Sequence, residues 1–356
     1  MRIAWFASSL VSSYWNGAAT YYRGLVRALH ERGHDVTFFE PDAYDRQANR
    51  DLDDPRWARV VVYDPERWEA AVEQARGADV VVKASGVGVC DAELEASVLE
   101  LDAETAIFWD VDAPATLARV EGDAADPFGE LIPRYDLVLT YGGGEPVVER
   151  YRTLGARECV PVYNALDPET HHRVTAEARF RCDLAFLGNR LPDREARVEE
   201  FFLRAAELVA ERSFLLGGAG WDDKALPPNV RAIGHVGTGD HNVFNSTPLA
   251  VLNVTRQDMV DNGWSPPTRV FEAAGAAACL ITDAWEGIDE FLEPGVEVLV
   301  AEDGERVAEL LRELTPERAR TIGERARTRV LRDHTYVQRA AQVEHVLAAA
   351  AGALRR

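Results

Sequence analysis

The segment 251–283 reads VLNVTRQDMVDNGWSPPTRVFEAAGAAACLITD and decides the fold class. Two apolar runs of strand length, residues 251–254 and 280–282, flank an amphipathic stretch over 266–277 that predicts a helix. Near-continuous apolar strands separated by helices are typical of a parallel sheet that is covered on both faces. The segment therefore predicts two parallel strands joined by a helix.

The same alternation runs along nearly the whole chain. The strand predictions are 3–7, 36–40, 60–63, 80–83, 106–109 and 137–141 in the first half, and 184–187, 214–216, 230–233, 251–254, 280–282 and 298–301 in the second. The helix predictions are 19–32, 66–75, 92–101, 145–154, 194–209, 266–277, 306–314, 316–332 and 336–354. Two such runs predict two α/β units, each a doubly wound parallel sheet.

The chain has 356 residues, which suits two domains of about 150 to 180 residues each. The polar stretch 166–181 lacks strong apolar periodicity and contains Pro168, so it predicts an interdomain linker. We therefore expect an N-terminal domain over 1–165 and a C-terminal domain over 182–335. An Ala-rich helix over 336–356 is expected to pack back toward the N-terminal domain.

Composition excludes several classes of protein. The formal net charge of -21 argues against a nucleic-acid partner, because phosphate backbones require basic surfaces. No apolar run approaches the ~20 residues that span a bilayer, and the first residues lack the long apolar centre of a signal peptide. The four cysteines form no C-x-x-C pair. We therefore expect a cytoplasmic protein without a membrane span, a metal or a cofactor.

The richest candidate site lies at the start of the predicted 266–277 helix. Ser265 is a suitable N-cap and Pro266 suits the first helical position. Free helix N–H groups flanked by Arg256 and Arg269 predict an anion site that suits a diphosphate. Glu272 is placed to accept hydrogen bonds from ribose hydroxyls. The alternative is an ordinary capped core helix whose charged residues face solvent.

A second donor-side element follows the predicted 184–187 strand, where Gly188 is followed by Arg190 and Arg194. A glycine with two arginines suits a phosphate clamp, although charged loops are also common on surfaces. The predicted donor-binding residues are Glu272, Arg256, Arg269, Ser265, Thr268, Arg190, Gly188 and Asn253.

In the N-terminal half, Asp110 and Asp112 follow the predicted 106–109 strand. Carboxylates at a strand end suit general-base catalysis or binding of sugar hydroxyls, and we predict both as catalytic. The alternative is that Asp112 caps a helix. Asn16 and Gly17 follow the first strand in a loop of small residues, which predicts an acceptor-side loop or an ordinary helix start.

The histidines give no metal-binding pattern in sequence. His171 and His172 are adjacent and lack a metal-ligand spacing. His235 and His241 flank the glycine-bearing loop 234–239, which is a candidate to line a nucleotide base. No histidine is predicted as a site residue.

The segments 252–259, 265–275 and 280–287 resemble the CgeB-like glycosyltransferases, relatives of glycosyltransferase family 4 that are often described as spore-maturation proteins. The resemblance extends to residues 16–17, 32–36, 110–114 and 132–136. It implies a GT-B fold, with two Rossmann-like domains facing a cleft, the acceptor mainly on the first domain, the donor mainly on the second, and no metal requirement.

By resemblance, Glu272 matches the glutamate that contacts the donor ribose, and Arg190 matches an arginine on the donor phosphates. Trp264 stands where these enzymes have a first glutamate, and the segment 110–112 stands where many relatives have a strand-end histidine. The sequence thus predicts a hexosyltransferase-type enzyme that uses a nucleoside-diphosphate sugar and an unidentified acceptor. Two alternatives stay open: a nucleotide-sugar epimerase or hydrolase on the same fold, and a non-catalytic protein that binds sugar nucleotides or glycans.

Overall fold

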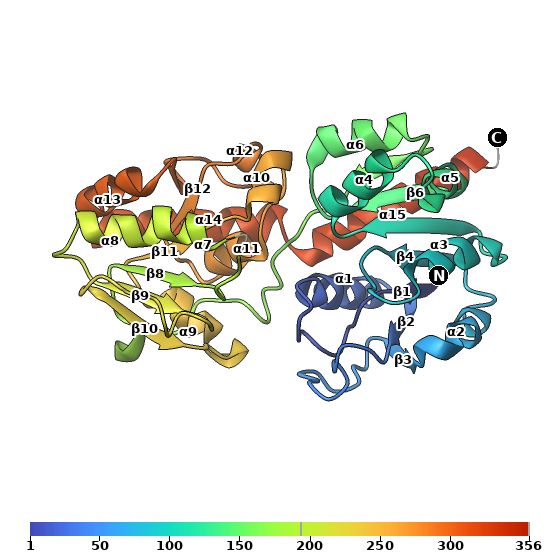
Figure 1. The fold of residues 1–356 in the computed structure, drawn as a ribbon, viewed down its shortest axis with the longest axis horizontal. Helices are drawn as coiled ribbons and strands as arrows, with labels where there is room; N and C mark the ends of the chain where they lie inside the picture. Colours follow the sequence, from blue (N-terminus) through green and yellow to red (C-terminus); the bar gives the residue numbers. More distant parts are fainter. Residues whose placement is uncertain (193, 355–356) are drawn as a thin grey trace. The chain divides into compact units, whose positions relative to one another are not determined.

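The computed structural model describes residues 1–192 and 194–354, which form two compact units (Figure 1). The first unit consists of Met1–Asn164 together with the C-terminal helix α15 (Tyr336–Leu354). The second unit is Ala165–Thr335. The segment 166–181 therefore lies within the second unit.

In its described residues, the first unit has a seven-stranded parallel sheet with the order β3-β2-β1-β4-β5-β6-β7. Its strands are β1 (Arg2–Phe6), β2 (Asp35–Pro41), β3 (Arg59–Tyr63), β4 (Val80–Ala84), β5 (Thr105–Asp110), β6 (Leu137–Thr140) and β7 (Cys159–Pro161). The strand order reverses between β1 and β4. In such sheets, ligands bind beyond the carboxyl ends of the strands near this reversal.

Helices cover both faces of this sheet because successive strand side chains point to opposite faces. The Phe6 ring stacks on the Phe39 ring, with 4.5 Å between the ring centroids, and belongs to the core under α2 to α6. Trp5 points the other way and contacts Trp109 at 4.6 Å and Tyr22 of α1. The helices are α1 (Ala19–Glu31), α2 (Trp68–Gln74), α3 (Asp91–Ser97), α4 (Ala113–Gly122), α5 (Pro127–Leu131) and α6 (Gly144–Thr153).

The C-terminal helix α15 packs on α1 of the first unit, where the red helix lies among elements that are coloured blue to green in Figure 1. The close approach depends on Gly24, because a Cβ there would lie 2.1 Å from Cδ2 of Tyr336. The Tyr336 ring is 3% exposed and also contacts Tyr21. Arg339 donates a hydrogen bond to the Tyr163 carbonyl at 3.1 Å. The first part of helix α15 thus contributes to the core of the first unit.

We expect Gly24→Ala to lower the free energy of unfolding of the first unit by about 1 to 3 kcal/mol, the usual cost of overpacking a core. The overlap with the buried Tyr336 ring should outweigh the gain of up to about 1 kcal/mol that alanine brings within a helix. Urea unfolding followed by tryptophan fluorescence measures the change. Gly122→Ala in α4 is the control, because no atom lies within 4 Å of a Cβ there. Equal losses in the two variants would contradict the prediction.

The second unit has a six-stranded parallel sheet over its described residues, with the order β10-β9-β8-β11-β12-β13. The strands are β8 (Leu184–Leu187), β9 (Phe214–Gly217), β10 (Val230–Gly234), β11 (Ala250–Asn253), β12 (Leu280–Asp283) and β13 (Leu299–Ala301). The helices are α7 (Glu195–Val198), α8 (Arg204–Leu208), α9 (His241–Ser246), α10 (Gln257–Asn262), α11 (Thr268–Gly275), α12 (Ile288–Phe291), α13 (Gly304–Glu313) and α14 (Pro316–Asp333). A π-helical turn, Glu199–Leu203, joins α7 to α8.

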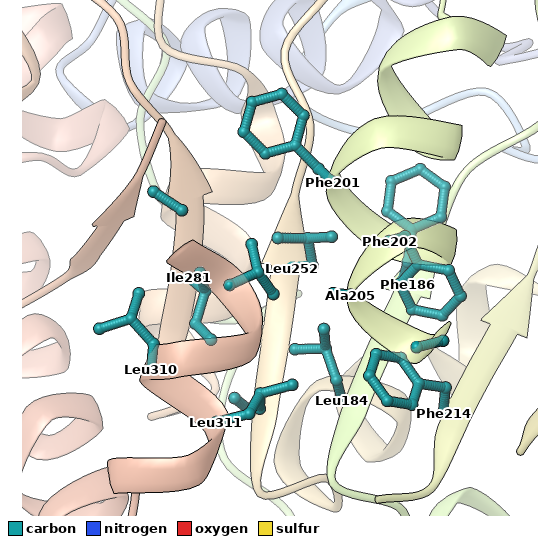
Figure 2. Close-up of a cluster of buried hydrophobic side chains, with 14 of the residues drawn as sticks. Leu184, Phe186, Phe201, Phe202, Ala205, Phe214, Leu252, Ile281, Leu310 and Leu311 are labelled. Atoms are coloured by element: carbon teal, nitrogen blue, oxygen red, sulfur yellow. The ribbon is translucent and has the colours of Figure 1, made fainter. Parts of the chain in front are cut away.

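Figure 2 shows the apolar core of this unit, where strand residues such as Leu184 and Leu252 meet Phe202 and Leu311 from the covering helices. All four side chains are fully buried. A core of this kind fixes the strands, and with them the loops that follow their carboxyl ends. Removal of apolar surface from water supplies the main driving force for this arrangement.

The two parallel sheets confirm the predicted α/β fold class, and each predicted strand agrees with the structure to within one residue at either end. The sequence missed the three-residue edge strand β7, the helix α4, and the helices α5, α9, α10 and α12, which have only four to six residues each and so show no clear periodicity. Among the described helices, none combines the length and apolar character that crossing a lipid bilayer requires.

Candidate functional site

A pocket of about 170 Å³ lies beyond the carboxyl ends of β8 and β11 in the second unit. It is lined by five of the residues predicted to bind the donor, namely Gly188, Asn253, Arg256, Thr268 and Arg269, and by Arg194. Three arginines converge on this pocket. A pocket lined in this way is suited to bind an anion.

Glycines let the loops around this pocket approach each other. A Cβ on Gly188 would lie 2.9 Å from the Phe186 ring and 3.0 Å from Nη1 of Arg194. Gly218 has a φ of +124°, and a Cβ there would lie 2.1 Å from the Gly188 carbonyl oxygen. Trp221 donates a hydrogen bond to the same carbonyl at 2.8 Å. The turn after β8 is therefore held tightly at the pocket wall.

A buried polar network supports the pocket from the ends of β11 and β12. Asn253 is 3% exposed, and its amide donates to the hydroxyls of Thr255 and Thr282 at 3.1 and 3.0 Å. Asp283 is fully buried and accepts hydrogen bonds from the Thr255 N–H and hydroxyl and from Arg197 Nη2 at 2.6 Å. Asp283 and Arg197 were not predicted. The position of Asp283 at the end of a predicted strand could have marked it as a site residue. No sequence pattern marks Arg197.

The prediction that Ser265 caps the helix is wrong. Helix α11 begins at Thr268 with Pro267 at the N-cap, and the Ser265 hydroxyl donates to the Gly263 carbonyl at 2.8 Å. The physical reason is the proline pair, because Pro267 disfavours the helical conformation at the residue before it. Pro266 therefore cannot begin the helix. The helix start remains at the pocket, with Thr268 and Arg269 among its lining residues.

Arg269 is the most unusual charge in this pocket. Its Nη1 atom is buried, and no hydrogen-bond partner for it is present among the described residues. Burial lowers the pKa of the guanidinium, and the negative charge of Glu272 opposes that shift. A buried donor atom without a partner is costly, so a negatively charged ligand that accepts a hydrogen bond from Nη1 would stabilise this side chain.

Arg190 lies apart from this lining. Its guanidinium pairs with Glu195 and Asp223, each at 2.7 Å, and donates to the Gly220 carbonyl. Arg194, four residues further along the chain, lines the pocket. The two arginines of this loop are thus directed to different surroundings, which their spacing in sequence does not reveal.

Glu272 lies on α11 beyond the pocket, and His171 and His241 come from two other segments of the same unit. Glu272 Oε1 is 3.7 Å from His171 Nε2, and one ligand atom from each of the three residues lies within 4.8 Å of the others. All three side chains are half-buried. Burial lowers the pKa of His241, while the negative charge of Glu272 opposes the shift.

In the first unit, Asp110 is fully buried at the end of β5. It accepts hydrogen bonds from the hydroxyls of Ser85, Thr116 and Tyr151 at 2.7, 3.0 and 2.5 Å, and from the Asp112 N–H at 3.0 Å. Burial raises the pKa of this carboxyl group, and the hydrogen bonds act against that shift. The oxygens of Asp110 thus point into the unit rather than into solvent.

Asp112 is exposed and stands at the N-cap position of α4, but its side chain makes no capping hydrogen bond. It lines a pocket of about 250 Å³ together with Ser85, Thr116 and Arg119, among others. The structure therefore separates the two aspartates, because only Asp112 presents its carboxylate at the surface of the unit.

Asn16 and Gly17 lie in the loop after β1. The Asn16 side chain is 9% exposed and is bonded within the loop, since it accepts from the Ser8 hydroxyl and donates to the carbonyls of Ser9 and Ser12. Gly17 is exposed, and a Cβ there would meet no atom within 4 Å. Fully buried Glu40, which was not predicted, anchors the same loop through the Ser9 hydroxyl and the Leu10 N–H.

This architecture is similar to that of known proteins. Residues 194–345 match a family model described as glycosyl transferase-like. No curated protein sequence matches the chain. Solved structures match along almost the whole chain, but at low sequence identity, so they establish the fold alone.

One similar structure is HepE from Anabaena in complex with UDP and glucose, with a TM-score of 0.68, 14% identity and coverage of 98% of this chain and 100% of that one. Another is sucrose-phosphate synthase from Thermosynechococcus elongatus, with a TM-score of 0.71, 15% identity and coverage of 99% and 100%. The T4 phage enzyme BGT in complex with UDP-glucose matches with a TM-score of 0.57, 12% identity and coverage of 100% and 98%. The chain therefore has the GT-B fold of glycosyltransferases.

Proposed function

We propose that this protein transfers a glycosyl group from a nucleoside-diphosphate sugar to an acceptor hydroxyl. The observation that carries the proposal is half-buried Arg269 at the start of α11, whose buried Nη1 atom has no hydrogen-bond partner in the described parts of the chain. A diphosphate would neutralise it, together with Arg194 and Arg256 on the same pocket.

Two further features support a diphosphate. The first N–H groups of a helix have no carbonyl partner in a preceding turn, and those of α11 begin at Thr268 on the pocket wall. The solved GT-B structures with UDP or UDP-glucose, and the glycosyl transferase-like match over 194–345, favour a nucleotide sugar over a simple anion. We assign Glu272 to the ribose hydroxyls, as the sequence predicts.

In the proposed reaction, the acceptor oxygen bonds to the anomeric carbon while the bond from that carbon to the diphosphate oxygen breaks. The leaving diphosphate takes the bonding electrons, and the arginines and helix N–H groups stabilise its negative charge without a metal ion. The acceptor hydroxyl loses its proton to a base, for which exposed Asp112 is the candidate. Buried Asp110 acts as a positioning residue, because it accepts the Asp112 N–H and fixes the end of β5.

Thermal-shift screening against nucleoside diphosphates and their sugars tests the proposal. A ligand at ~100 times its Kd should add about 2.7 kcal/mol to the stability of the folded state. Glu272→Gln should reduce the shift, and Arg256→Ala should abolish it. Transfer is then assayed with the best donor and a panel of acceptors. A panel without any shift would contradict the proposal, and turnover of donor that no acceptor alters would point to an epimerase or hydrolase.

A further inference from the structure

We propose that His171, His241 and Glu272 form a binding site for a divalent transition metal ion such as zinc. Two imidazoles and one carboxylate are a three-ligand set that zinc uses in open sites, where water or another ligand occupies the fourth position. Ligand atoms on one zinc ion lie at most about 4 Å apart, given metal–ligand distances near 2 Å. His171 Nε2 and Glu272 Oε1 are 3.7 Å apart, and all three ligand atoms lie within 4.8 Å of one another. Small side-chain movements would therefore bring the three atoms within reach of one metal ion.

The three residues come from separate segments that independent contacts hold together. Asn242 of α9 accepts a hydrogen bond from the His172 N–H at 3.1 Å and donates to the Thr170 carbonyl at 2.9 Å. These bonds fix the segment that carries His171 beside the helix that begins with His241. The same residue, Asn242, thus links two of the three ligands.

Gly275 brings the same segment against the third ligand. It lies one turn after Glu272 on α11, and a Cβ there would lie 2.8 Å from the His171 carbonyl oxygen. A larger residue would therefore push the His171 backbone away from α11. Close packing at Gly275 and the hydrogen bonds of Asn242 together define the position of the His171 ring.

The remaining ring nitrogen of His171 has a partner of the kind that orients metal-binding histidines. His171 Nδ1 is 3.0 Å from the Thr170 hydroxyl, which leaves Nε2 facing Glu272. Metal-binding histidines usually have such a second contact, because it fixes the ring orientation and the tautomer. The mixed nitrogen and oxygen set favours zinc, cobalt or nickel over magnesium or calcium, which prefer oxygen ligands.

Metal titration of the purified, EDTA-treated and desalted protein tests the site directly. We expect one equivalent of Co²⁺ to give the visible absorption bands of nitrogen coordination, and Zn²⁺ to displace it, whereas Mg²⁺ should not. His171→Ala and His241→Ala should each weaken zinc binding by more than ~100-fold, beyond the loss that removal of an outer partner causes. His172→Ala and His235→Ala are the matched controls, because these exposed neighbours lie outside the cluster.

Zinc binding at one equivalent that both cluster variants lose and both controls keep would support the proposal. Absence of saturable binding in the unaltered protein would overturn it, and so would binding that the cluster variants retain. Circular dichroism of each variant separates loss of the site from loss of the fold. A variant that fails to fold is replaced by His171→Gln or His241→Gln.

One consequence rests on the proposed function. Glu272 cannot hold a metal ion and the donor ribose at once, so zinc should weaken donor binding in the unaltered protein and in His172→Ala, but not in His171→Ala. Chelation of zinc by the donor phosphates affects all three proteins equally and therefore cancels in this comparison. Zinc binding without any donor binding would contradict the proposed function alone, and donor binding without zinc binding would contradict the metal site alone.

Discussion

Replacing Arg269 with methionine should weaken nucleoside-diphosphate binding by about 30-fold or more and leave the unliganded second unit at least as stable as before. The guanidinium has a buried Nη1 without a hydrogen-bond partner in the described structure, so an apolar side chain of similar length removes an unsatisfied buried donor. Loss of one member of a buried charge pair with the ligand costs about 2 to 5 kcal/mol, or about 30-fold or more in Kd. Calorimetric titration and urea unfolding measure the two effects.

Arg190→Met is the matched control, because Arg190 belongs to the same unit but pairs with Glu195 and Asp223 outside the pocket. We expect it to change the Kd by less than about 3-fold, in line with the small energies of exposed ion pairs. If Arg269→Met binds nucleotide as tightly as the unaltered protein, the diphosphate does not lie at the start of α11. A loss of stability in that variant would show that Arg269 has a structural role.

The second large effect is expected for Asp283→Ala, which should lower the free energy of unfolding of the second unit by about 3 to 5 kcal/mol. The substitution leaves the Arg197 guanidinium and the Thr255 N–H group without their buried acceptor. Arg197 is 18% exposed at its side chain, so water replaces the lost partner only in part. Urea unfolding measures the change, and Asp289→Ala on the exposed side of α12 should stay within about 0.5 kcal/mol.

A double variant separates the charge effect from the loss of packing. Adding Arg197→Met to Asp283→Ala removes the cation that has lost its carboxylate partner, so the double variant should lose less stability than the sum of the two single variants. Additive losses would show that the two side chains do not stabilise each other. The network also carries Asn253, so nucleotide binding should weaken together with stability.

The fold was predictable because the buried strands of a parallel sheet are apolar on both faces and need no partner information to be recognised. The apolar runs that precede Asn253 and Asp283 predict strands, and both runs are strands in the structure. The start of α11 was less predictable. Its position depends on the Pro266–Pro267 pair, whose backbone restriction outweighed the capping preference of Ser265.

The candidate site was predictable where a residue follows a strand or begins a helix. Gly188, Asn253, Arg256, Thr268 and Arg269 line one pocket because the carboxyl ends of neighbouring parallel strands meet at one edge of the sheet. Orientation was not predictable from the same pattern. Asp110 and Asp112 look equivalent in sequence, yet β5 ends at the fully buried Asp110, whereas Asp112 lies beyond the strand at the exposed N-cap position of α4.

By itself, the sequence determined the two doubly wound α/β units and the segments that supply the pocket, because hydrophobic period and strand-end position are local properties of the chain. Only the tertiary structure decided which charges lack a partner and which distant residues meet. Arg190 differs from Arg194 in its neighbours rather than in its spacing, and His171, His241 and Glu272 converge from segments far apart in the chain. Such contacts depend on packing between elements, which no local pattern records.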